Sequence, residues 1–167
     1  MATIHIDEIK ARARRAHEDT AVREAYFTAM LESDRNEAVN AAWTLTHLPK
    51  SDDKHIATHR EAMVELATTT PDTSLRRITL ALLERIDWHF DKEPSAYYMA
   101  LLDFCFSHMM RPDEPYGVRS LCMKLAYRLS LPYPELLEEL RQSLLLIEPS
   151  ELGAGVRHTR NKILKSL

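Results

Sequence analysis

The sequence predicts an all-α fold built from antiparallel pairs of helices. Its 167 residues favour Ala, Leu, Glu and Arg and include three glycines, which suits helices and leaves little material for tight hairpin turns. Eight prolines divide the chain into segments that have the apolar periodicity of an α-helix. One apolar pattern also occurs three times between residue 75 and residue 167. These three observations define the fold class.

The prolines predict where the helices begin and end. Proline lacks a backbone N–H and costs about 3 kcal/mol in a helix interior, so it is expected between helices or in a first turn. The prolines stand at positions 49, 71, 94, 112, 115, 132, 134 and 149. They predict eight to nine helices, near residues 5–18, 21–32, 36–48, 52–69, 72–88, 94–110, 115–130, 133–147 and 151–166.

Local signals support several of these helix starts. Ser51 is expected to cap the helix at 52–69, and Thr70 the helix at 72–88. Pro94 and Pro134 stand where a first helical position is expected. Because the connections are short, consecutive helices should pack as antiparallel neighbours.

The repeated pattern defines one apolar face on three helices. The segments begin at Leu75, Val118 and Val156. In each, apolar residues or threonine follow three, seven, eight and eleven positions later, which places them on one helical face. An arginine comes second each time, at Arg76, Arg119 and Arg157. The separations of 43 and 38 residues fit two helices with their turns.

With these residues the chain resembles HEAT and armadillo repeat proteins. The stretches PDTSLRRITLALLERI and PYGVRSLCMKLAYRL carry the resemblance, and residues 36–48 are a looser copy without the arginine. The resemblance covers roughly residues 34–167 and implies a short right-handed α-α superhelix of stacked helix pairs. Residues 1–33 are interpreted as an atypical amino-terminal capping hairpin within a single domain, 1–167.

Charge and composition restrict the compartment and the partners. The net charge of −3 gives no overall attraction for nucleic acid or an anionic membrane. No apolar run approaches the length of a membrane-spanning helix, and the charged amino terminus lacks the apolar core of a secretory signal. Cys105 and Cys122 lie in apolar helical patterns and should pack as small hydrophobes. A cytoplasmic protein without a membrane partner is expected.

The three arginines are the first candidate site. Each lies in a first helical turn, where the helix dipole disfavours a cation, so each should gain a favourable partner. The resemblance implies a ladder of Asp or Glu with Arg76, Arg119 and Arg157 between repeats. The alternative is a column that binds an anionic partner on a concave face. The ladder is favoured, because partly exposed ion pairs are common.

An aromatic segment at a helix end is the second candidate. Trp88 and Asp91 lie just before Tyr97 in the sequence. These residues either wall a cleft or, as is more common for aromatic side chains, close the core between two repeats. Together with the arginines they complete the candidate partner-binding set, which is Arg76, Arg119, Arg157, Trp88, Asp91 and Tyr97.

Two further groups have simpler interpretations. His55 and His59 have the spacing that puts two imidazoles on one helical face, but no third ligand is indicated, so no metal and no cofactor are expected. The last helix carries Arg157, Arg160, Lys162 and Lys165. These cations either touch phosphates or pair with the acidic helix before them, and pairing is favoured.

The function that the sequence favours is a non-catalytic HEAT-like interaction module or scaffold that binds a protein or peptide. Motifs for nucleotide binding and for a nucleophilic serine are missing, although this leaves catalytic activity open. The alternative is a HEAT-like alkylpurine DNA glycosylase or DNA-binding protein, which the acidic net charge disfavours. A helical lyase of the fumarase and aspartase type ranks last, because the G-S-S-x-M-P-x-K-x-N loop is absent.

Overall fold

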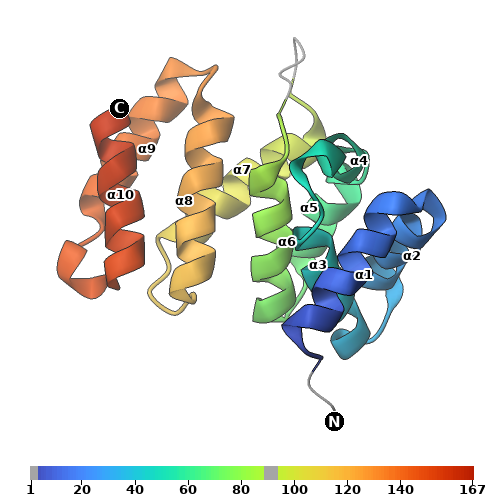
Figure 1. Ribbon diagram of the computed structural model, residues 1–167. Helices are drawn as coiled ribbons and strands as arrows, with labels where there is room; N and C mark the ends of the chain where they lie inside the picture. Colours follow the sequence, from blue (N-terminus) through green and yellow to red (C-terminus); the bar gives the residue numbers. More distant parts are fainter. Residues whose placement is uncertain (1–3, 89–93) are drawn as a thin grey trace. The chain divides into compact units, whose positions relative to one another are not determined.

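The computed structural model describes residues 4–88 and 94–167, and within them it contains helices and no strand (Figure 1). The α-helices are α1 Ile6–Glu18, α2 Thr20–Glu32, α3 Arg35–Thr46, α4 Asp53–Ala57, α5 Arg60–Thr69, α6 Thr73–Arg85, α7 Ala96–Met109, α8 Tyr116–Ser130, α9 Pro134–Leu146 and α10 Ala154–Ser166. Two 3-10 turns, η1 Lys50–Asp52 and η2 Pro149–Glu151, complete them. The predicted all-α fold of helix pairs is confirmed.

The chain forms two compact units, Met1–Asp87 and Trp88–Leu167. In the first unit α3 packs against both α1 and α6, while α2 contacts α5. The pairs α2–α3 and α5–α6 are the closest neighbours in this unit. Two layers therefore form, α1–α3–α6 and α2–α5 (Figure 1).

Aspartates set the start of three helices in the first unit. The Asp19 carboxylate accepts from Ala21 N at 2.8 Å, and the Asp34 carboxylate accepts from Asn36 N at 3.1 Å. The Asp72 carboxylate accepts from Leu75 N at 2.7 Å, so the cap of α6 is Asp72 and not the predicted Thr70. Each carboxylate satisfies an N–H that the helix itself leaves unbonded.

The predicted helix at 52–69 is wrong, because the structure divides it. The 3-10 turn η1 precedes α4, and the chain breaks helical geometry around His59 before α5 begins. The His59 ring stacks on Phe27 with ring centroids 3.9 Å apart, and its Nε2 lies 2.8 Å from Glu24 Oε2. These contacts with α2 draw His59 out of line with a continuous helix.

In the second unit α8 is the central helix. It packs against α7, α9 and α10. The Ser120 and Thr159 hydroxyls are hydrogen bonded at 2.9 Å and join α8 to α10. Pro134 occupies the first position of α9 as predicted, whereas α7 begins after Pro94, with Ser95 as its cap.

The repeated apolar pattern faces the core in all three helices that carry it. On α6 its buried positions include Leu82 and Leu83, and on α8 they include Leu125. On α10 Val156 and Ile163 are buried, while the pattern ends at the exposed Leu167. Stacking therefore covers an apolar stripe that a single hairpin would leave in water.

The two cysteines pack as predicted. Cys105 on α7 and Cys122 on α8 are buried and carry free thiols. Burial, and secondarily the proximity of Cys122, raises the pKa of the Cys105 thiol well above its usual value. A buried neutral thiol acts as a small apolar side chain. Within residues 4–88 and 94–167, no helix has the length and apolar character needed to cross a membrane.

Candidate functional site

The three arginines of the repeated pattern donate to backbone carbonyls at the end of the preceding helix or loop. Arg76 donates through Nε to Ala67 O at 3.2 Å and through Nη2 to Thr70 O at 2.6 Å. Arg119 donates through Nε to Met109 O at 3.0 Å. The last carbonyls of a helix lack intrahelical partners, so these bonds satisfy the ends of α5 and α7.

Arg157 makes the same kind of contact with the loop before α10. It donates through Nε to Pro149 O at 3.1 Å and through Nη2 to Leu152 O at 2.9 Å. Neither sequence interpretation anticipated carbonyl acceptors for these arginines. Arg119 is 3% exposed, so its side chain belongs to the core of the second unit. A role of the three arginines in partner binding stays a prediction.

Two other arginines share this role and were missed. Arg23 on α2 donates through Nη1 to Ala16 O at 3.3 Å, at the end of α1. Arg160 on α10 donates through Nε to Leu144 O at 2.8 Å, at the end of α9. Both are buried. The available signal for Arg23 was the Val-Arg pair at residues 22–23, which matches the start of the repeated pattern. Arg160 is the seventh residue of α10, and the repeated pattern does not mark it.

The aromatic candidates divide between core and surface. Trp88 is 8% exposed and meets the Tyr98 ring edge to face, with centroids 6.1 Å apart. The Tyr98 hydroxyl donates to Leu129 O, and burial raises the pKa of this phenol. Tyr97 is half-buried on α7. Asp91 lies outside the described residues, so the proposed cleft stays a prediction.

Histidines pair with carboxylates in the first unit. His17 Nδ1 lies 2.8 Å from Asp52 Oδ2, and His59 holds Glu24 as described above. Both pairs attach the segment before α5 to α1 and α2. In the part of the chain that the structure describes, no group of three His, Cys, Asp or Glu side chains is arranged to hold a metal ion.

A pocket opens in the first unit between the carboxyl ends of α2 and α5, and we call it the α2–α5 pocket. Its volume is about 560 Å³. Its lining comprises Met30, Leu31, Ser33, Arg35, Ala38, Leu66, Thr69, Thr70, Pro71, Asp72 and Leu75. Met30, Ala38 and Leu75 are buried and form an apolar floor, while the polar side chains come from the helix ends around it. This arrangement suits an apolar group with polar neighbours.

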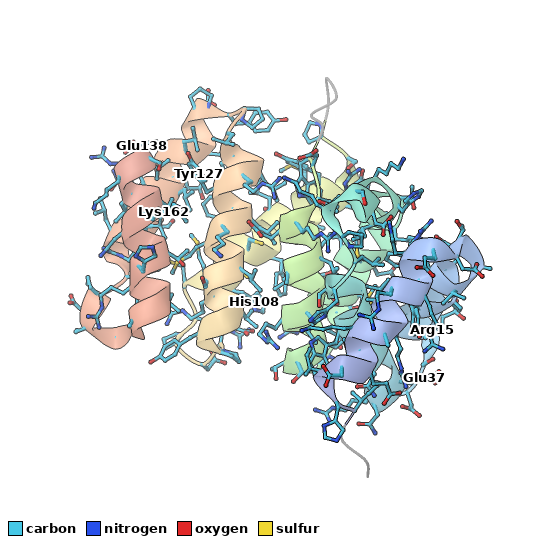
Figure 2. All side chains as sticks on the ribbon, in the orientation of Figure 1. Arg15, Glu37, His108, Tyr127, Glu138 and Lys162 are labelled. Carbon is cyan, nitrogen blue, oxygen red and sulfur yellow. The ribbon has the colours of Figure 1, made fainter. Side chains whose placement is uncertain are left out.

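A second candidate surface, the cationic face, lies on α8 and α10. These adjacent helices carry seven arginines and lysines and no aspartate or glutamate. Arg119 and Arg160 are buried on carbonyls, whereas Lys124, Arg157, Lys162 and Lys165 are exposed. Figure 2 labels Lys162 on α10. Among the described side chains, no ion pair joins α10 to the acidic α9, so the favoured pairing of these helices is wrong.

The stacked helix pairs, with buried or half-buried arginines that donate to the carbonyls of preceding helix ends, define a helical repeat protein. The family comparison identifies which one: the model of the HEAT repeat domain matches residues 1–167, and the chain belongs to this family. The match includes residues 1–33, which lay outside the resemblance drawn from the sequence. The comparisons with curated proteins and with solved structures found no match.

Proposed function

We propose that this HEAT repeat protein is a non-catalytic cytoplasmic scaffold that binds a peptide segment of a protein partner. The observation that carries the proposal is the α2–α5 pocket, an open depression of about 560 Å³ lined by side chains from two helix pairs. That volume lies within the usual range of ligand sites. A large apolar side chain of the partner enters the pocket, and its backbone meets the polar groups at the edge.

Burial supplies the favourable free energy of this contact. Moving a Leu or Phe side chain from water into an apolar pocket contributes about 1.5–3 kcal/mol. One such side chain gives weak binding by itself, so a natural partner needs contacts beyond the pocket. Of the six candidate residues from the sequence, the exposed Arg157 and the half-buried Tyr97 are proposed as partner contacts on the second unit, separate from the pocket.

A selection from a random-peptide display library tests the proposal. We expect enriched peptides that share a large apolar residue and bind the wild-type protein. They should lose most of their affinity for Leu31→Gln, because Leu31 lines the pocket. Leu145→Gln, on an exposed position of α9, is the matched control and should bind normally. Enriched peptides that bind both variants equally, or no enrichment, would contradict the proposal.

The cationic face favours nucleic acid as a second candidate partner. His158, Lys162 and Lys165 are exposed and follow one face of α10, and Lys124 lies one turn from the contact between α8 and α10. Exposed cations on two adjacent helices that carry no acids of their own suit a phosphate backbone. Fluorescence anisotropy with a labelled single strand and a labelled duplex should show affinity that falls with salt. Binding that Lys162→Gln and Lys165→Gln leave unchanged would exclude this face.

A further inference from the structure

The edge of the α2–α5 pocket holds an arginine in a fixed position. Arg35 is the first residue of α3, and its Nε donates to Asp72 Oδ2. The other carboxylate oxygen, Oδ1, accepts from Leu75 N at 2.7 Å. Asp72 therefore holds α6 and Arg35 at the same time, which limits the positions that the guanidinium can take.

The carboxylate that orients Arg35 stays ionised over a wide pH range. The N–H of Leu75 is the largest cause, and Arg35 contributes as well, so the pKa of Asp72 lies below its usual value. The side chain of Asp72 is 14% exposed, whereas that of Arg35 is 68% exposed. The inner end of the ion pair is thus fixed, and the outer end faces solvent at the pocket.

The outer end of Arg35 has two nitrogen atoms available. In the described part of the chain, Nη1 and Nη2 of Arg35 have no hydrogen-bond acceptor. The Ser33 hydroxyl lines the same pocket, and it too has no described hydrogen bond. Two N–H donors in a fork and one hydroxyl match the oxygens of a carboxylate.

We propose that the α2–α5 pocket binds the carboxyl-terminal end of a partner protein whose last residue has a large apolar side chain. This inference rests on the proposed function and adds the chemistry of the partner. The side chain occupies the apolar floor around Met30 and Leu75, and the terminal carboxylate accepts from Arg35 Nη1 and Nη2. A chain terminus satisfies both parts of the pocket with a single residue, because its carboxylate and side chain share one Cα.

Nearby acids set a limit on this attraction. Asp34, Glu32 and Glu37 also lie near the end of α2 or the start of α3. The Asp34 carboxylate is occupied in part by Asn36 N and Glu37 N at the helix start. The positive end of the α3 dipole partly offsets the negative charge of these acids. Specificity for a carboxylate therefore depends on direct contact with Arg35 and not on a broad positive field.

Two small probes separate the apolar and the charged contributions. N-acetylleucine and N-acetylleucinamide have the same side chain and differ in the terminal carboxylate. Both are titrated into the full-length protein labelled with ¹³C at the methionine methyl groups, and the Met30 signal is followed by NMR. We expect both probes to shift this signal saturably, with N-acetylleucine about five to ten times tighter at low salt. The ratio should approach one in 1 M salt.

Variants assign the ratio to Arg35. Arg35→Gln should bring the two affinities together while the amide binds as before, and Arg35→Lys should keep part of the preference, because it retains charge without the fork. Arg77→Gln, an exposed arginine outside the pocket, is the matched control and should keep the wild-type ratio. The dispersion of the other methionine methyl signals checks that each variant is folded.

The outcomes distinguish the two proposals. Saturable binding of both probes with equal affinity overturns the carboxylate assignment but still supports a pocket that binds an apolar side chain. A preference that survives Arg35→Gln also overturns it. If N-acetyl-Leu-Asp amide binds more tightly than N-acetylleucine, the ligand is an internal acidic segment and the assignment of a chain terminus is wrong. A Met30 signal that neither probe shifts overturns both the pocket and this inference.

Discussion

Replacing Arg119 with Met should destabilise the second unit. The Met side chain keeps most of the apolar stem of Arg119 and removes the guanidinium that donates to Met109 O at 3.0 Å. A hydrogen bond from a charged donor contributes about 1.5–3 kcal/mol. Removing a buried charge recovers part of its desolvation cost, so we expect a net loss of about 1–2 kcal/mol in the free energy of unfolding.

Tryptophan fluorescence can report this loss from the second unit alone. The protein has two tryptophans, of which Trp43 lies in the first unit and Trp88 in the second. In a Trp43→Phe background, urea unfolding followed at Trp88 gives the transition of the second unit, even if the two units unfold separately. The shift of the midpoint at constant slope measures the change in stability.

Lys124→Met in the same background is the control for this experiment. Lys124 is exposed on α8, the helix that carries Arg119, so its replacement should change the stability of the second unit by less than about 0.5 kcal/mol. If Arg119→Met unfolds at the wild-type urea concentration, the carbonyl contact contributes nothing to stability. The stabilising role inferred for the five arginines would then fail at one of the two most buried of them.

Three further predictions concern single side chains. The fold lowers the pKa of Asp72, so the ionised carboxylate stabilises the protein fully above pH 3.8, the usual pKa, and this stabilisation is lost as the pH falls through the lower pKa of the folded state. The difference in unfolding free energy between wild type and Asp72→Asn, measured by urea unfolding, should therefore shrink in acid. A difference that stays constant with pH would contradict this prediction. The raised pKa of Cys105 predicts slow reaction with a thiol reagent in the native protein and fast reaction in urea, and rapid native labelling would show that it is not protected. Finally, His59→Ala should lower the stability of the first unit by about 1–2 kcal/mol by removing the Phe27 stack and the Glu24 contact, as followed at Trp43, whereas the exposed His5→Ala should not.

The sequence predicted the helices well because their signals are local. Apolar periodicity and proline placement both act within one helix, and Pro134 stands at the start of α9 as expected. The helix at 52–69 failed for the opposite reason. Its apolar spacing continues from Ile56 to Met63 with a helical period, and the break at His59 depends on Phe27 and Glu24 on α2. Such tertiary contacts override local preference.

The site was predicted in part. The sequence located Arg76, Arg119 and Arg157 but assigned them acidic partners. Every residue type has a backbone carbonyl, so the sequence does not show which carbonyl at a helix end accepts a hydrogen bond. The α2–α5 pocket could not be predicted, since its lining comes from the ends of α2 and α5 and the starts of α3 and α6, across residues 30–75. Whether four helix ends enclose a volume or fill it depends on packing, which spacing along the chain does not specify.

The copy of the repeated pattern at residues 36–48 lacks the arginine, and it leads to a final prediction. Val39 matches Leu75 in the repeat, and Asn40 stands where Arg76 would be. Arg76 donates to carbonyls nine and six residues before it, which correspond to residue 31 at the end of α2 and to residue 34 at the start of α3. A pocket of about 320 Å³, lined by Ala29, Asp34 and Asn40 among others, leaves room for a longer side chain there.

Asn40→Arg should therefore donate to the carboxyl end of α2 and stabilise the first unit. The expected gain is about 1 kcal/mol, which is typical of one net hydrogen bond, measured as a higher urea midpoint at Trp43. Asn40→Lys adds the same charge without the planar fork and should gain less. If both variants gain equally, the benefit comes from charge near Asp34 and Glu37. If neither does, the arginine contact depends on features of the other repeats that α2 and α3 do not share.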